Sequence, residues 1–280
     1  MSALEDDSEA AGGTTPAGRS AVPGPFWFRV RVAFVWLTLL VLFVLFFMTF
    51  DLKFSFIVDK FPMIAGLRLS KDGFLQGAAL TLFVCLISIA ASSILGFASA
   101  LARLSSSAVL YGISTFYTSF FRGTPLLVQI FLIYLGLPQL GPVPDAIPAG
   151  IIALSLNYGA YLSEIFRSGI MSVPKGQKEA GAALGLRPWM ILWKIILPQA
   201  TRIAIPPTGS QFIAMLKDSS LISVMGVWEI MFLAQSFGRA SYRYIEMLTT
   251  AAVIYWILSL AFELIQARLE AHFGKGDRHR

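Results

Sequence analysis

Residues 179–198 read EAGAALGLRPWMILWKIILP, and the stretch holds two short helical patterns separated by a break. The first pattern is rich in alanine and ends at Gly185, since glycine readily adopts the left-handed conformation that terminates a helix. The second begins at Arg187–Pro188, where proline suits a first turn, and is expected to stop at Pro198. Apolar residues at i, i+3, i+4 and i+7 predict one apolar stripe: Trp189, Leu192, Trp193 and Ile196.

This stretch belongs to a polar loop between very apolar segments. Upstream of it, Ser172 is expected to cap the first helix, with Pro174 in the opening turn. A small-residue helix at a loop tip suits docking into a groove on another protein. An amphipathic connector on the membrane surface would explain the second helix but not the first.

The composition of the whole chain indicates an all-α integral membrane protein. Of 280 residues, 56% are hydrophobic and 14% are charged, whereas soluble domains carry about 25% charged residues. Cys85 is the sole cysteine, which excludes an intrachain disulfide, and both histidines lie near the C-terminus. A metal site of histidine and cysteine is therefore not expected.

Six segments approach the roughly 20 apolar residues that a membrane helix needs. The first belongs to an N-terminal transmembrane helix predicted over residues 29–51. The six expected spans are Val32–Phe50, Phe74–Leu101, Val109–Leu137, Ile147–Ile165, Ile203–Val224 and Met247–Ala267. The second is rich in small residues, which allow close helix packing in lipid.

The distribution of basic residues predicts the orientation. With the N-terminus inside, fourteen lysines and arginines fall on the inner side and six on the outer side, as the positive-inside rule requires. Both termini are then cytoplasmic, with a disordered tail at 1–28, a periplasmic loop at 52–72 and a C-terminal tail at 269–280. The polar segment 226–246 is expected at the outer surface, as an interfacial or capping helix or as part of the mouth of a path.

Arg122 lies within the third expected span, where a charge is costly unless it faces protein or water. Pro125 follows closely, lacks an N–H and would clash with the carbonyl of Phe121, so a broken helix is predicted. Arg122 could line a polar path or form a structural ion pair. Gln129 would share its face only if the helix continued.

Further polar residues interrupt the fourth and fifth spans. Lys217 and Asp218 point about 100° apart on a helix, which favours a polar path or gate over a simple helix end. Asn157 and Tyr158 are weaker candidates midway along the fourth span. Glu164 is expected to form an interfacial ion pair with Arg167.

Several catalytic motifs are absent from the sequence. There is no G-x-x-x-x-G-K-[ST], no H-E-x-x-H and no G-x-S-x-G. The chain is therefore not expected to hydrolyse ATP through a P-loop of its own or to act as an intramembrane hydrolase. No catalytic residue is predicted.

The opening stretch resembles the cytoplasmic signature of permease subunits of binding-protein-dependent ABC importers, E-A-A, three residues, Gly, nine residues, I-x-L-P. Glu179, Ala180 and Gly185 match, as do Ile195 and the Leu197–Pro198 pair, while Gly181 replaces an alanine. The stretches FFRGTPLLVQIFLIYLGLP (120–138), GAYLSEIFRSGIMSVPKGQ (159–177) and LPQATRIAIPPTGSQFIAMLKDSSLISVMGV (197–227) resemble the polar amino-acid subfamily, of the histidine and glutamine type.

This resemblance implies a five-helix type I ABC importer permease core over residues 73–268, with a coupling loop at 170–200 and one extra N-terminal helix. It implies a bacterial inner-membrane subunit that works with a second permease (identical or homologous), a cytoplasmic ATPase dimer and a periplasmic or lipid-anchored binding protein. ATP and Mg would bind the ATPase, and this chain would bind no cofactor. The implied coupling residues are Glu179, Ala180, Gly181, Ala183, Leu184 and Gly185. The positions that best fit a substrate pathway for an amino acid are Arg122, Gln129, Asn157, Gln211, Lys217 and Asp218.

Two other classes of protein remain open at this point. An ion-coupled secondary transporter also uses broken helices, although paired repeats are not evident here. A non-transporting scaffold or sensor would explain the loop but not the charges within the spans. Nucleic acid is not expected as a partner, because the positive charge follows the membrane topology.

Overall fold

The computed structural model describes residues 26–49, 52–70 and 73–273, which divide into two units, residues 1–52 and 53–280. Residues 1–25 and 274–280 of the two expected tails lie outside the described part. In the first unit, α1 (Phe26–Met48) is one helix, and an 18-residue window within Phe26–Phe46 has a mean hydropathy of 2.2. It covers most of the first expected span and begins six residues earlier, since the residues from Phe26 to Arg31 continue the same helix.

Three long helices of the second unit confirm three further spans. They are α3 (Gly77–Leu104), α6 (Ala146–Met171) and α11 (Tyr244–Phe273). At 1.5 Å per residue each is about 39 Å or longer, which exceeds the roughly 30 Å of membrane hydrocarbon. With α1, four described helices are long and apolar enough to cross a membrane.

The two remaining expected spans lie in helical segments that are sharply bent. Helix α4 (Ala108–Gly123) meets residues Leu126–Leu140 at 108°, and the segment Pro188–Met225 meets α10 (Ile230–Ser241) at 49°. The first bend confirms the break predicted at Pro125. Beyond it the chain forms α5 (Leu126–Phe131), a π turn η1 (Leu132–Gly136) and a 3₁₀ turn η2 (Leu137–Leu140).

The fifth expected span is the later part of a longer helical segment. It contains α8 (Pro188–Ile191), a π turn η3 (Leu192–Ile196), α9 (Leu197–Asp218) and the 3₁₀ turn η4 (Ser219–Met225). The expected stop at Pro198 is wrong. Pro198 is the second residue of α9 and follows the π turn η3 closely, and this wider turn lets the helix continue through a residue that has no N–H to donate.

Glycines bring α3 and α6 into close contact. A Cβ atom on Gly96 would lie 2.8 Å from Leu162 Cβ and 3.0 Å from the carbonyl oxygen of Gly159. No side chain larger than hydrogen fits without moving backbone. The expectation that small residues of this span serve helix packing is thereby supported.

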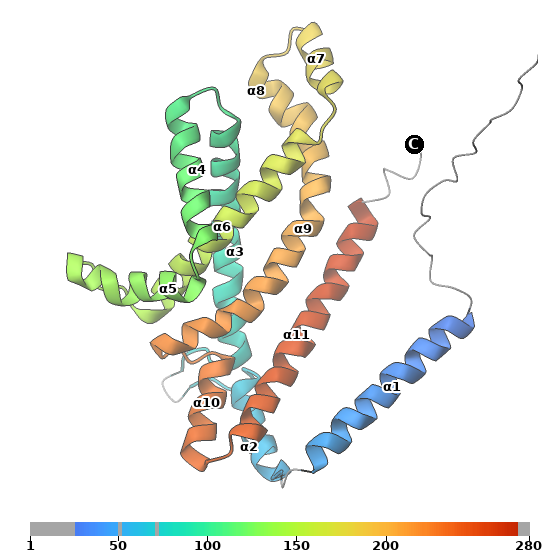
Figure 1. The fold of residues 1–280 in the computed structure, drawn as a ribbon, viewed down its shortest axis with the longest axis vertical. Coiled ribbons are helices and arrows are strands. Elements are labelled where there is room, and N and C mark those ends of the chain that lie inside the picture. Colours follow the sequence, from blue (N-terminus) through green and yellow to red (C-terminus); the bar gives the residue numbers. More distant parts are fainter. Residues whose placement is uncertain (1–25, 50–51, 71–72, 274–280) are drawn as a thin grey trace, which may run out of the picture. The chain divides into compact units, whose positions relative to one another are not determined.

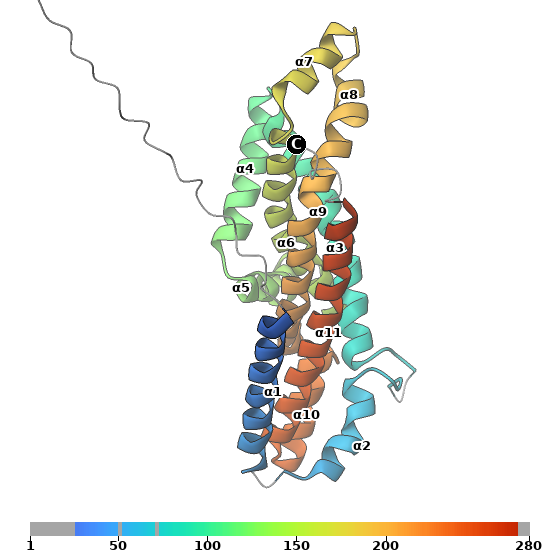
Figure 2. The ribbon, with the colours of Figure 1, turned by 90° about the vertical axis from the view of Figure 1, so that its right-hand side faces the viewer.

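The ends of the second unit carry different short helices. Figures 1 and 2 show α7 (Lys175–Ala183) and α8 at one end, and α2 (Phe54–Ile64) and α10 at the other. Helix α10 buries Ile230, Leu233 and Ala234 in a cluster with residues of α2 and α11. The polar segment 226–246 thus contains a helix that caps the bundle, and the expected loop 52–72 contains α2.

Candidate functional site

The break at Pro125 leaves the backbone carbonyl of Phe121 without its helical hydrogen-bond donor. Two of the predicted site residues donate to this carbonyl instead. The carbonyl of Phe121 precedes Pro125, which has no N–H to donate. Instead, Gln129 Nε2 donates to this oxygen at 2.9 Å and Asn157 Nδ2 donates to it at 3.0 Å. Asn157 Nδ2 also lies 3.1 Å from Gln129 Oε1. These two amides therefore stabilise the break between α4 and α5.

Arg122 does not share the environment of Gln129. Its side chain is exposed, and its guanidinium carbon lies 5.4 Å from the centroid of the Tyr161 ring. This is a cation–π contact across α4 and α6. Within the described residues Arg122 forms no ion pair, so the structural ion pair considered from the sequence is not found there.

Asp218 and Lys217 lie in different surroundings, as their angular separation predicts. Asp218 accepts a hydrogen bond of 2.8 Å from the hydroxyl of Tyr158, which ties the end of α9 to the middle of α6. Lys217 is exposed and lines a groove between α9 and α11. Gln211 is half-buried on α9.

The groove contains functional candidates that the sequence reasoning missed. Its polar lining on α11 consists of Glu263, Gln266 and Glu270. Their spacing of three and four residues was the available signal, because it places them on one face of a helix. The last expected span was identified from its apolar residues alone, and its polar residues were therefore not considered as site candidates.

The predicted docking helix is α7, which ends at Ala183 and is followed by Gly185 with φ +73°. This confirms the helix stop at Gly185. Most of the signature is exposed, and Leu184 has 78% of its surface accessible. Gly181 is the buried member, because α7 packs there against Ile191 and Ile195.

One local prediction for this loop is wrong. Ser172 does not cap α7; its hydroxyl donates to the carbonyl of Gly169 at 2.7 Å, and Pro174 occupies the N-cap position. The apolar stripe stays a prediction: Trp189 and Trp193 are 57% and 58% exposed on this chain, and the Trp193 ring lies 6.2 Å from that of Phe97. The residues that face Gly181 of α7 are Ile191 and Ile195.

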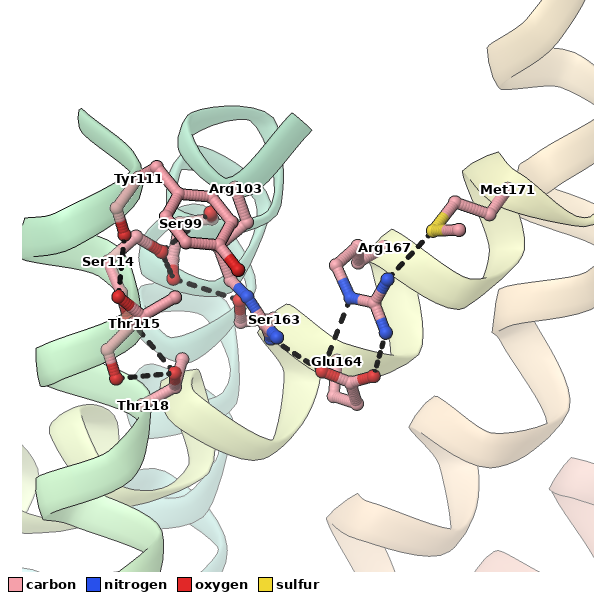
Figure 3. A network of polar contacts seen from close by, with 10 residues as sticks. All are labelled: Ser99, Arg103, Tyr111, Ser114, Thr115, Thr118, Ser163, Glu164, Arg167 and Met171. Carbon is pink, nitrogen blue, oxygen red and sulfur yellow. Dashed lines mark hydrogen bonds and ion pairs between the residues drawn. The ribbon is translucent and has the colours of Figure 1, made fainter. Parts of the chain in front are cut away.

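A polar cluster joins three helices next to the loop (Figure 3). The Ser99 hydroxyl of α3 lies 2.6 Å from that of Ser114 on α4 and 2.8 Å from that of Ser163 on α6. The next residue of α6, Glu164, forms ion pairs with Arg103 of α3 and Arg167 of its own helix. The expected Glu164–Arg167 pair is confirmed, and Arg103 extends it between helices.

The cluster connects the membrane helices to the start of the docking loop. Arg167 Nη1 lies 2.7 Å from the sulfur of Met171, the last residue of α6. Helix α7 begins four residues later, at Lys175. The arrangement can therefore hold the loop in a defined position relative to α3 and α4. No group of three or more histidine, cysteine or acidic residues that could hold a metal occurs in the described ranges.

The known proteins to which this chain is similar are all membrane components of transport systems. Residues 92–275 match the family model described as "Binding-protein-dependent transport system inner membrane component". The chain is 37% identical to the arginine transport system permease protein ArtQ of Bacillus subtilis over 81% of this chain and 100% of the relative. It is 34% identical to the glutamine transport system permease protein GlnP of Escherichia coli, over 70% and 90%.

A solved structure supports the same fold. The crystal structure of an amino acid ABC transporter with histidines contains a chain that is 34% identical to this one. The match covers 80% of this chain and all of the other, with a TM-score of 0.71.

Proposed function

Since the chain belongs to the family of inner-membrane components of binding-protein-dependent transport systems, and is an amino-acid ABC importer permease, we propose that it moves a polar amino acid inward through ATP hydrolysis by a partner subunit. The observation that carries this proposal is the exposed helix α7 with its E-A-G-x-x-x-G signature. A helix of small residues at a loop tip can enter a groove on a second protein.

The docking surface consists of the exposed signature residues around Gly185: Glu179, Ala180, Ala183 and Leu184. Gly181 contributes from beneath, because it allows α7 to lie close to α8 and η3. The ATPase dimer binds this surface and holds the ATP and Mg, while this chain binds neither. The side that carries α7 is the cytoplasmic side, in agreement with the excess of basic residues there.

The polar residues around the broken helix and the end of α9 form the proposed pathway: Arg122, Gln129, Asn157, Gln211, Lys217 and Asp218. Gln129 and Asn157 contribute by shaping the break, since both donate to the Phe121 carbonyl. A broken membrane helix is tolerated where its backbone lines a cavity or is buried in protein. A second permease subunit completes the pathway, and a periplasmic or lipid-anchored binding protein delivers the amino acid.

The test is ATP hydrolysis by the complete complex reconstituted in liposomes, with and without the binding protein and amino acid. Glu179→Ala should lower substrate-stimulated hydrolysis by about tenfold or more, since the ATPase loses its hydrogen bonds to a charged carboxylate, which contribute about 1.5–3 kcal/mol. Gln177→Ala, on the same helix but outside the signature, serves as the matched control and should retain stimulation.

Full coupling and assembly of the Glu179→Ala variant would refute the docking role. Vesicles that contain the permease without an ATPase test the competing ion-coupled transporter. Uptake driven there by an ion gradient alone would favour that function instead.

A further inference from the structure

Glu229 is a buried acidic residue that has no role in the function proposed so far. It is 0% exposed and lies in the linker between η4 and α10, outside the expected membrane spans. As the N-cap residue of α10, it accepts hydrogen bonds from the backbone N–H groups of Met231 at 2.9 Å and Phe232 at 2.7 Å. These two bonds are local, so they move together with α10.

A third hydrogen bond joins Glu229 to a different helix. The hydroxyl of Tyr255, on α11, donates to Glu229 Oε2 at 2.7 Å. In the part of the chain that the structure describes, this is the only side-chain hydrogen bond between α10 with its N-cap and another helix. The other contacts of α10 are largely apolar, with Ile230, Leu233 and Ala234 packed in a cluster with residues of α2 and α11. The carboxyl group of Glu229 therefore specifies where α10 is held on α11.

The linker before α10 has the features of a hinge. The segment Pro188–Met225 meets α10 at 49°, and Gly226 at the bend has φ +82°. The carbonyl of Trp228 accepts a hydrogen bond from the N–H of Gly77 at 2.8 Å, which fixes the pivot on α3. Hinges are commonly a few loop residues or residues at the ends of elements. Helix α10 lies at the end opposite α7, which is the outer end in the proposed function, and its position there depends on Glu229.

No cation pairs with Glu229 within the described residues. The titratable groups that face it are the Tyr255 hydroxyl of α11 and the Cys85 thiol of α3. The charged groups on the surrounding elements are paired, hydrogen-bonded or exposed: Asp59 with Lys60 on α2, Asp218 with Tyr158, Arg243 with Glu246, and the exposed Lys217 and Arg239. A buried carboxylate without a cation is costly, so this site favours the neutral, protonated acid.

Burial raises the pKa of Glu229 from its ordinary value of 4.5 to about 7, although the hydrogen bonds to the carboxylate oppose the rise. When the carboxyl group is neutral, it can donate its own proton to the Tyr255 oxygen, and the contact between the helices is kept. When that proton is lost to water, the charge regains its solvation only if α10 leaves α11. The stabilisation of the closed position is therefore complete below about pH 4.5 and is lost as the pH rises through about 7.

We propose that Glu229 is a positioning residue for transport: a proton on its carboxyl group holds α10 against α11, and release of that proton to the outer solution frees α10 to open. The inference rests on the proposed transport function, in which the amino acid enters past the outer end of the helices. The proton concentration outside thus regulates entry at the end opposite the ATPase.

Labelling of a buried cysteine on α10 tests the inference in the complex of full-length permease and ATPase in nanodiscs. Ala234→Cys, in a Cys85→Ala background, places a thiol at a position that is 0% exposed, and a membrane-impermeant methanethiosulfonate modifies it only when α10 opens. Arg239→Cys, exposed on the same helix, gives the reference rate at each pH, so the ratio of the two rates is free of thiol ionisation. The ratio should fall about tenfold from pH 8 to pH 6, because Glu229 becomes protonated over this range.

Glu229→Gln cannot ionise, so its ratio should stay low and change less than about twofold between the same pH values. Tyr255→Phe removes only the hydroxyl and should raise the ratio at pH 6 by about threefold or more. Asp59→Asn is the matched control, since Asp59 is an exposed acid of α2 at the same end, and it should keep the tenfold response. Leu233→Cys, also buried, replaces Ala234→Cys if that variant does not assemble.

A ratio that does not depend on pH in the protein with Glu229, a buried cysteine that is never modified, or an unchanged response in Glu229→Gln would overturn the inference. A Tyr255→Phe ratio equal to that of the parent protein would do the same. The two proposals fail separately. Absence of ATP-driven amino-acid uptake by the complete complex in liposomes refutes the proposed function, whereas uptake together with a pH-independent ratio refutes only the role of Glu229.

Discussion

Gly181 offers a direct test of how α7 is held. A Cβ atom at this position would lie 3.0 Å from Ile191 Cγ1 and 3.0 Å from Ile195 Cδ1. These contacts are close, but both atoms belong to flexible side chains. Gly181→Ala should gain about 1 kcal/mol of helix propensity and lose about 0.5–1.5 kcal/mol as the isoleucines leave their preferred rotamers, so the two effects nearly cancel.

Gly181→Leu has no such compensation. Its branched side chain must occupy the space of both isoleucines, and overpacking of this kind costs about 1–3 kcal/mol. The expected result is a lower free energy of local opening for α7, with amide hydrogen exchange of its residues faster by about tenfold or more. Substrate-stimulated ATP hydrolysis of the reconstituted complex should fall with it.

Gly176→Leu is the matched control, because Gly176 lies on the same helix and a Cβ atom there meets nothing within 4 Å. Its α7 amides should exchange as slowly as those of the wild type, or more slowly. If Gly181→Leu exchanged at the wild-type rate, α7 would not be held against Ile191 and Ile195, and the reasoning would be refuted.

Substitutions at three further places test the contacts between membrane helices. Glu164→Gln should lower the free energy of unfolding by about 2 kcal/mol, between the values for exposed and buried ion pairs, as measured by thermal unfolding in detergent; no change would mean that the ion pairs contribute nothing. Gln129→Leu and Asn157→Leu should each lower the free energy of unfolding by about 1 kcal/mol. The double variant should lower it by more than the sum, since only then does the Phe121 carbonyl lose both donors. Strict additivity would argue against a shared acceptor. Gly96→Ala should destabilise the protein by about 1–3 kcal/mol, and wild-type stability would contradict the close approach of α3 and α6.

The sequence predicted those features that depend on neighbouring residues. Pro125 is enough to indicate a broken helix, and Gly185 is enough to end α7, because backbone chemistry acts locally. The donors to the freed Phe121 carbonyl were not predictable as such, since Asn157 lies 36 residues away. Gln129 and Asn157 were chosen as pathway residues for their polarity, yet their observed contacts are with backbone carbonyls at the break, with the Thr124 hydroxyl and with each other.

The wrong stop at Pro198 has its origin in a π turn. A helical pattern of 3.6 residues per turn does not anticipate η3, and this turn explains why Pro198 lies inside a continuing helix. Glu263 was missed for a different reason, because the apolar residues around it outweigh a single charge in any average over the span.

The π turn at Leu192–Ile196 has a consequence for how the docking helix is presented. A π turn absorbs one extra residue within a single wider turn, so deleting that residue would restore regular helix and leave α7 facing nearly the same direction. The same deletion from a regular turn of α9 would rotate α7 by about 100° relative to the membrane helices, although every residue of its signature remained unchanged. The helix between the membrane and α7 can thus change length by one residue without turning the signature away from an ATPase only where a π turn takes up the difference.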